Sequence, residues 1–188
     1  MPALSPSSIA VIVVALLVVL ILILVAVRAQ RTRHLQRRFG PEYDRTVAAA
    51  QDRREAESQL QAREKQRQRF RSRDLDAGEL SRFREQWGAL QVRFVDEPSA
   101  SVRDADALVN QVMTQRGYPM SEFEQRSADI SVDYPNVVEN YRHARRISVA
   151  NNDGKASTED LRRSLVYYRS LFDELLGSST TDRLKETV

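Results

Sequence analysis

The chain has 188 residues, a formal net charge of +3, two histidines and no cysteine. The lack of cysteine excludes disulfides, thiol nucleophiles and thiolate metal ligands. Few other groups suited to catalysis are present, so the composition argues against an enzyme.

Residues 9–27 form an uninterrupted run of nineteen apolar residues, sixteen of which are Val, Ile or Leu. As a helix this run is about 29 Å long, close to the roughly 30 Å hydrocarbon core of a bilayer. A cleaved signal peptide is the alternative, but it requires a basic start and a shorter apolar stretch. Residues 1–8 carry no Lys or Arg. We therefore expect a single transmembrane helix over residues 9–27, preceded by a short extracytoplasmic N-terminus.

The predicted orientation follows from the basic residues that flank this run. No Lys or Arg precedes it, whereas five arginines follow it directly: Arg28, Arg31, Arg33, Arg37 and Arg38. Basic flanks remain on the cytoplasmic side of a membrane. We expect a single-pass protein of the plasma membrane, with its N-terminus outside and its C-terminal domain in the cytoplasm.

Residues 28–73 are predicted to form a basic juxtamembrane and spacer segment. They contain fourteen Lys and Arg against six Asp and Glu, whereas residues 74–188 contain fifteen against twenty. Gly40-Pro41 predicts a helix end and a new helix start. Beyond it, residues 42–71 lack Gly and Pro, and their apolar residues share no face, which is typical of a solvated polar helix. Such a spacer, if straight, holds the next domain about 40 Å from the membrane.

Residues 74–176 are predicted to form a bundle of four to five amphipathic helices, because their apolar residues recur at spacings of three and four. The first helix covers residues 77–95, and Pro98 opens a second that runs to Arg116 and stops at Gly117. The two buried stripes are Leu80, Phe83, Trp87, Leu90 and Phe94, then Ala105, Leu108, Val109, Val112 and Met113.

The remaining helices are predicted from capping residues. Ser121 and Glu124 have the spacing of a capping box for a short helix that contains Phe123 and Ile130. Pro135 is expected to open a further helix that ends near Asn151. The last helix is expected to start at Ser157 or Thr158 and to end at Gly177, leaving residues 177–188 as a disordered tail. Its stripe comprises Leu161, Leu165, Tyr168, Phe172 and Leu175, and no sheet is expected because no period of two occurs.

Neither histidine is placed for catalysis or metal binding. His34 lies among the membrane-flanking arginines, and His143 lies beside Arg142 and Arg145, where we expect a surface position. Residues 149–160 resemble a calcium loop only in part, because a glycine at the sixth position puts Val149 at the first, where it offers no side-chain oxygen. We predict no catalytic, cofactor-binding or metal-binding residues. Tyr167 and Val166 lie off the buried stripe and are candidates for a contact surface.

The basic cluster of Arg67, Arg69, Phe70, Arg71 and Arg73 raises the question of nucleic acid. Base recognition requires a helix-turn-helix, a zinc site or an aromatic platform, and none of these is recognisable. Nucleic acid is therefore not a predicted partner.

Five segments, in order, resemble a widespread bacterial family of short membrane-anchored proteins that are often labelled secreted or hypothetical. They read LQRRFGPEYDR (residues 35–45), RFVD (93–96), RGYP (116–119), ASTEDLR (156–162) and YYRSLFDELL (167–176). The resemblance implies a bacterial plasma membrane and an all-helical layout, and it supplies no catalytic residues. The label "secreted" conflicts with the orientation that the arginines predict.

The sequence favours a non-enzymatic membrane-anchored protein that presents a cytoplasmic helical interaction domain, as a scaffold or adaptor. Its predicted partners are the lipid bilayer and another protein, with no cofactor and no small-molecule substrate. One alternative is a regulator that senses anionic lipid or nucleic acid through the arginine-rich spacer. A secreted protein of unknown function and an enzyme with an unrecognised site are the others.

Overall fold

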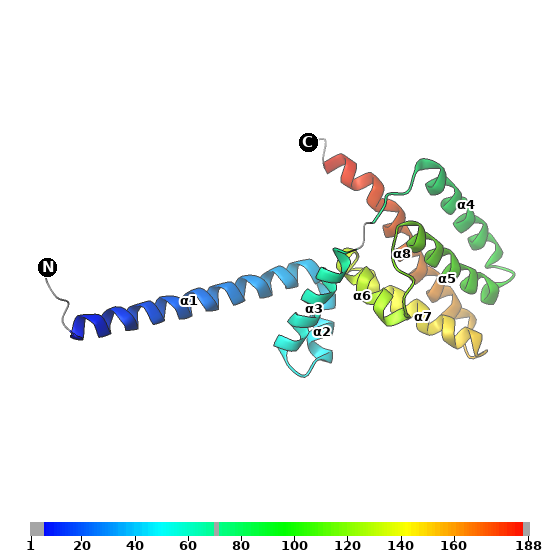
Figure 1. The fold of residues 1–188 in the computed structure, drawn as a ribbon. Helices are drawn as coiled ribbons and strands as arrows, with labels where there is room; N and C mark the ends of the chain where they lie inside the picture. The colour runs from blue at the N-terminus through cyan, green and yellow to red at the C-terminus, as the bar shows by residue number, and fades with distance from the viewer. Residues whose placement is uncertain (1–5, 70–71, 186–188) are drawn as a thin grey trace.

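The computed structural model describes residues 6–69 and 72–185, with side chains described for residues 15–69 and 72–177. Within these ranges every regular element is an α-helix and no strand occurs, which confirms the predicted all-α class. Figure 1 shows the long first helix projecting from one side and the remaining helices grouped around its C-terminal end. The helices are α1 (Pro6–Phe39), α2 (Pro41–Ala49), α3 (Arg53–Arg67), α4 (Ala77–Arg93), α5 (Pro98–Gln115), α6 (Phe123–Asp133), α7 (Val138–Asn152) and α8 (Thr158–Lys185).

The first helix, α1, is long and apolar enough to cross a membrane. The stretch that meets this criterion is Ala15–Phe39, and none of its most apolar window is buried against the rest of the chain. Its aliphatic side chains from Leu16 to Val27 are 40–63% exposed. As predicted, α1 continues beyond the apolar run and stops at Gly40, whose φ of +47° favours glycine. Pro41 then occupies the first position of α2.

The segment predicted as one polar spacer helix is instead two short helices, α2 and α3, that fold back into a hairpin (Figure 1). Asp52 caps α3, its side chain accepting a hydrogen bond from the Glu55 amide at 2.8 Å. The apolar residues of this segment share no single face because they lie on two helices that face each other. They pack with the end of α1 into a small core of Leu35, Phe39, Tyr43, Leu60 and Val132.

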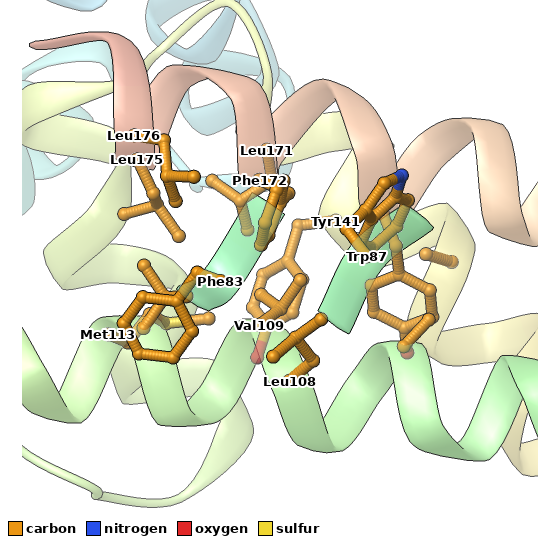
Figure 2. Close-up of a cluster of buried hydrophobic side chains, with 14 of the residues drawn as sticks. Phe83, Trp87, Leu108, Val109, Met113, Tyr141, Leu171, Phe172, Leu175 and Leu176 are labelled. Atoms are coloured by element: carbon orange, nitrogen blue, oxygen red, sulfur yellow. The ribbon is translucent and has the colours of Figure 1, made fainter. Parts of the chain in front are cut away.

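The main core lies among α4, α5, α7 and α8, and the predicted stripes form it. Figure 2 shows residues of α4, α5 and α8 converging, with Tyr141 of α7 among them. Trp87 stacks on Phe172 with ring centroids 4.6 Å apart and an interplanar angle of 24°. Such a pair adds about 0.5–1.5 kcal/mol beyond the burial of its apolar area.

Several predicted helix boundaries are confirmed. Pro98 opens α5, and Gly117 (φ +82°) ends it, with the Tyr118 amide donating to the Met113 carbonyl at 3.0 Å. Ser157 caps α8, because its hydroxyl accepts from the Asp160 amide at 3.2 Å. The capping box on α4, formed by Asp76 and Glu79, was not predicted from the sequence.

Three boundary predictions are wrong. Ser121 and Glu124 form no capping box, because α6 begins at Phe123 and its N-cap is Glu122. Pro135 lies in a turn, and α7 begins three residues later at Val138. Gly177 does not end α8, which continues to Lys185. A glycine inside a helix costs only about 1 kcal/mol, and Gly177 is not among the glycines with positive φ. The predicted tail is thus helical to residue 185, and residues 186–188 lie outside the described part of the chain.

Candidate functional site

The most distinctive polar site lies where the α2–α3 hairpin meets α6 and α7. We call it the junction and define it by six charged residues, Arg38, Glu42, Arg63, Arg67, Asp133 and Arg142. The hairpin reaches α6 through α3, and the end of α1 also contacts α6. The junction therefore connects the helix that could cross a membrane to the bundle.

Glu42 is the centre of the junction and is only 2% exposed. Arg142, one hundred residues further along the chain, donates to both of its carboxylate oxygens at 2.7 and 2.9 Å. Arg63 of α3 donates to the same carboxylate at 2.8 Å. Burial by itself raises the pKa of Glu42, but the two guanidinium groups outweigh it and hold the pKa below its usual value. A bidentate pair of this kind fixes orientation as well as distance.

A more exposed layer of charges surrounds this pair. Arg142 also donates to Glu139 at 3.2 Å, and Arg45 of α2 approaches the same carboxylate at 3.3 Å. The side chains of Arg45 and Glu139 are both 46% exposed. Exposed ion pairs contribute little to stability, so the buried Glu42–Arg142 pair dominates the energetics of this side of the junction.

Asp133, near the C-terminal end of α6, receives contacts from three other segments. Arg67 at the end of α3 and the Tyr118 hydroxyl both donate to it. Arg38 of α1 lies 3.9 Å away. Burial raises the pKa of Tyr118, and the nearby Asp133 carboxylate raises it further. The guanidinium of Arg67 also lies 5.0 Å from the centre of the Tyr118 ring. Asp133 thus links α1, α3 and the loop after α5.

Two hydrogen bonds to Glu57 of α3 hold the end of α1 and the start of α2 against that helix. The Thr32 hydroxyl donates to Glu57 at 2.8 Å, and the Tyr43 hydroxyl donates to the same carboxylate oxygen at 2.9 Å. His34 lies 3.5 Å from Glu64. The hairpin is therefore fixed to the turns of α1 that directly follow the apolar run.

A buried acid that the junction does not neutralise lies one turn before Asp133. Asp129 is 1% exposed and accepts one hydrogen bond, from Gln125 at 2.9 Å. Its other oxygen has no hydrogen-bond partner within the described part of the chain. Burial raises the pKa of Asp129, and the nearby charges of Arg67 and Arg63 only partly oppose this effect.

The membrane-flanking arginines divide into two groups. Arg28, Arg31, Arg33 and Arg37 are exposed and form no ion pair with the described residues. Arg38 instead contributes to the junction through Asp133. Of the residues considered for nucleic acid, Arg67 is in the junction and Arg73 binds Glu79, while Phe70 and Arg71 lie outside the described residues.

The two histidines lie on separate helices, His34 on α1 and His143 on α7. His143 is at the surface as predicted, with a side chain that is 41% exposed and lies 3.3 Å from Glu139. The ring of Tyr167 is 5.4 Å from that of His143, so Tyr167 is half-buried rather than free. Val166 is 54% exposed, as predicted.

Arg142, the neighbour of His143 in the sequence, is buried. It is 6% exposed because Glu42 compensates its charge inside the junction. Two side-chain oxygens of the loop considered for calcium already accept hydrogen bonds, Asn151 Oδ1 from the Ser99 hydroxyl and Asp160 Oδ2 from the Ser157 hydroxyl, each at 2.6 Å. Among the described residues no group of three potential metal ligands occurs.

Sequence reasoning missed Glu42, Arg63, Asp129, Asp133 and Arg142 as a group. Periodicity cannot detect them, since each looks like an ordinary polar residue of a solvated helix face. One signal was available. The segment of residues 35–45, which carries the resemblance described above, supplies Leu35, Arg38, Phe39, Glu42 and Tyr43 to the junction and its small core. Comparison of the chain with protein-family models, curated proteins and solved structures finds no match.

Proposed function

We propose that the chain is a non-enzymatic, single-pass membrane protein of the bacterial plasma membrane that holds a helical interaction domain at the cytoplasmic face. The observation that carries this proposal is the exposed apolar helix α1 followed immediately by arginines. An exposed aliphatic surface of this length is unfavourable in water and suited to lipid. The arginines favour a cytoplasmic position for everything that follows.

The junction supports the second part of the proposal, in which the domain has a fixed position. A flexible linker leaves a domain free to rotate about its anchor. Here the end of α1 contacts α3 through Thr32 and Glu57, and the hairpin contacts α7 through Glu42 and Arg142. A scaffold that presents one surface to a partner benefits from this arrangement, since less orientational freedom is lost on binding.

The assignment as a binding protein rests on the kinds of surface that the bundle offers. Two exposed aliphatic side chains lie at the end of α4, Val92 (76% exposed) in its last turn and Val95 (82% exposed) in the turn that follows. In Figure 1 the end of α4 faces away from the apolar part of α1. The two histidines lie on separate helices and contact different carboxylates, Glu64 and Glu139, so they do not come together in one site.

Protease protection tests the anchor and its orientation. We expect protease added to whole cells to leave the bundle intact, and protease added to inverted membrane vesicles to digest it. A matched variant carries Arg28→Gln, Arg31→Gln, Arg33→Gln and Arg37→Gln, because these side chains form no ion pairs with described residues. It should show a larger fraction of inverted molecules. Digestion of the bundle in whole cells contradicts the proposal, as does a product in the medium that lacks the first thirty residues.

Site-specific photocrosslinking tests the interaction domain. A crosslinking residue at Val95 in the full chain should give one discrete protein adduct in native membranes. The matched control places it at Gln59, which is exposed on the hairpin, and this control should not give that adduct. Absence of an adduct from Val95, or identical adducts from both positions, contradicts the proposed role of the bundle surface.

A further inference from the structure

A cleft of about 610 Å³ lies between the last turns of α1 and α3. Its polar lining comes from two facing helix surfaces, since residues 30, 31 and 34 share one side of α1 and residues 61, 65 and 68 share one side of α3. The lining residues that matter for recognition are Gln30, Arg31, His34, Gln61, Lys65 and Gln68.

The cleft combines two cations with three amide side chains. Neither Arg31 nor Lys65 forms an ion pair within the described part of the chain. The acidic residue in the lining, Glu64, lies 3.5 Å from His34. Guanidinium and ammonium groups are the side chains that bind phosphate oxygens, and amides add hydrogen bonds to neighbouring polar groups. The chemistry of the cleft therefore suits a phosphate ester.

The depth of the cleft favours a lipid as the source of that phosphate. Val27 is the last residue of the apolar run, so the polar residues on the α1 side of the cleft, from Gln30 to His34, lie about 5 to 10 Å beyond the hydrocarbon edge. The headgroup region of one leaflet is roughly 5 to 8 Å thick. Leu24 and Val27, which are 52% and 40% exposed, share the α1 face of Arg31 and lie where an acyl chain continues inward.

The structure keeps the two walls together without a ligand. Leu35 and Leu60, 1% and 0% exposed, pack in the small core directly behind the cleft. Thr32 contacts Glu57 at 2.8 Å on the adjacent turn. The backbone that carries Lys65 is therefore held opposite α1 before any ligand binds, so the two walls need no rearrangement to form the cleft.

We propose that this cleft binds the phosphate group of an anionic phospholipid, with Arg31 and Lys65 contacting the phosphate oxygens and the glutamine amides contacting the rest of the headgroup. The proposal rests on the membrane anchoring proposed above, and it holds for either orientation of the chain. A free phosphate ester has the same chemistry, so the test includes both sources.

Native mass spectrometry of the full chain in detergent micelles tests the cleft, with phosphatidylglycerol and phosphatidylcholine titrated separately. The cleft variant carries Arg31→Gln and Lys65→Gln. The matched control carries Arg33→Gln and Arg54→Gln, which also removes one cation from α1 and one from α3, at exposed positions outside the cleft. A third titration uses inorganic phosphate alone. All measurements are made at about 0.15 M salt, where diffuse attraction is screened beyond roughly 8 Å.

We expect the wild type to bind one phosphatidylglycerol in preference to phosphatidylcholine. The cleft variant should lose roughly tenfold to thirtyfold in affinity for it, and the control less than about threefold. Equal losses in both variants overturn the proposal, because they indicate diffuse charge attraction, and so does no loss in either. Binding of inorganic phosphate that depends on Arg31 and Lys65, without lipid selectivity, overturns the lipid assignment.

The same variants separate failure of this inference from failure of the anchor. Membrane flotation and protease protection report insertion and orientation independently of lipid selectivity. Wild-type protein that inserts normally but shows no lipid preference overturns the cleft alone. Protein that does not insert overturns the anchor. Both variants should keep the wild-type thermal transition, since the replaced side chains are exposed.

Discussion

The bundle and the junction are held together by different physics. The bundle core is apolar and aromatic, and most of its members recur at helical spacing on α4, α5, α7 and α8, with Ile130 contributed by α6. The junction has only five buried apolar residues in its core and depends on a buried carboxylate that binds two arginines. Apolar burial tolerates exchange of similar side chains, whereas a buried ion pair fails when one partner is removed. The bundle core should therefore tolerate conservative substitutions, whereas the junction should lose stability when either partner of its buried ion pair is replaced.

The largest expected effect is on the bundle. Trp87→Ala removes a side chain that is 4% exposed and stacks on Phe172, so it should lower the free energy of unfolding by about 3–5 kcal/mol. Denaturant unfolding of the full chain in micelles measures this loss. Trp87→Phe is the control, since it keeps an aromatic ring and removes an indole N–H that has no hydrogen-bond partner among the described residues. It should cost far less. Equal losses would show that ring stacking is not what Trp87 contributes.

The second-largest loss of stability is expected at the junction. Glu42→Gln leaves Arg142 buried with only the half-exposed Glu139 carboxylate as a charged partner, and we expect a loss of about 3 kcal/mol at neutral pH. The folded-state pKa of Glu42 is lowered, so its contribution is present above the unfolded pKa and is lost as pH falls through the folded pKa. Wild type and variant should therefore converge below about pH 4.

Two controls sharpen this comparison at the junction. Glu139→Gln changes a half-exposed carboxylate and should cost less than about 1 kcal/mol. Asp129→Asn changes a carboxyl with a raised pKa, whose contribution is present at low pH and is lost as pH rises through that pKa. The stability change caused by Asp129→Asn should therefore depend on pH with the opposite sign to the change caused by Glu42→Gln. A pH-independent loss for Glu42→Gln contradicts the ion-pair account.

The small core of the hairpin should show a local effect. Leu60→Ala removes a fully buried side chain, with an expected loss of about 2–3 kcal/mol because this thin core relaxes more easily than the bundle. Hydrogen exchange measures where the protection is lost. We expect faster exchange in α2 and α3, with the amides of α5 and α8 unchanged. Uniform acceleration would show that the hairpin and the bundle unfold as one unit.

The smallest effects concern two glycines and should have opposite signs. Gly40→Ala places a side chain at φ +47° and should destabilise by about 1–2 kcal/mol. Gly88→Ala lies inside α4, where an added Cβ meets nothing within 4 Å, and should stabilise by about 0.5–1 kcal/mol. Thermal unfolding of the two variants provides the comparison. The same sign for both would contradict the left-handed conformation at Gly40.

The contrast between the two regions also explains what the sequence could predict. Stripes such as Phe83, Trp87 and Leu90 repeat within one helix, so periodicity identifies them. The end of α1 and the start of α2 at Gly40-Pro41 could also be predicted, because each of these residues has a local conformational preference. The hairpin could not be predicted in this way, since its core combines residues 35, 39, 43, 60 and 132 from four helices. The Glu42–Arg142 pair spans one hundred residues, and no local pattern distinguishes a buried charge from a solvated one.

The fold-back of α2 and α3 has a consequence for how a partner is met. A chain anchored as proposed cannot extend its bundle far into the cytoplasm, because the hairpin returns the polypeptide to the last turns of α1. Its reach is set by the dimensions of the bundle itself. Membrane-bound partners can therefore reach the bundle by lateral diffusion in the same bilayer. Soluble partners must approach the membrane surface to bind it.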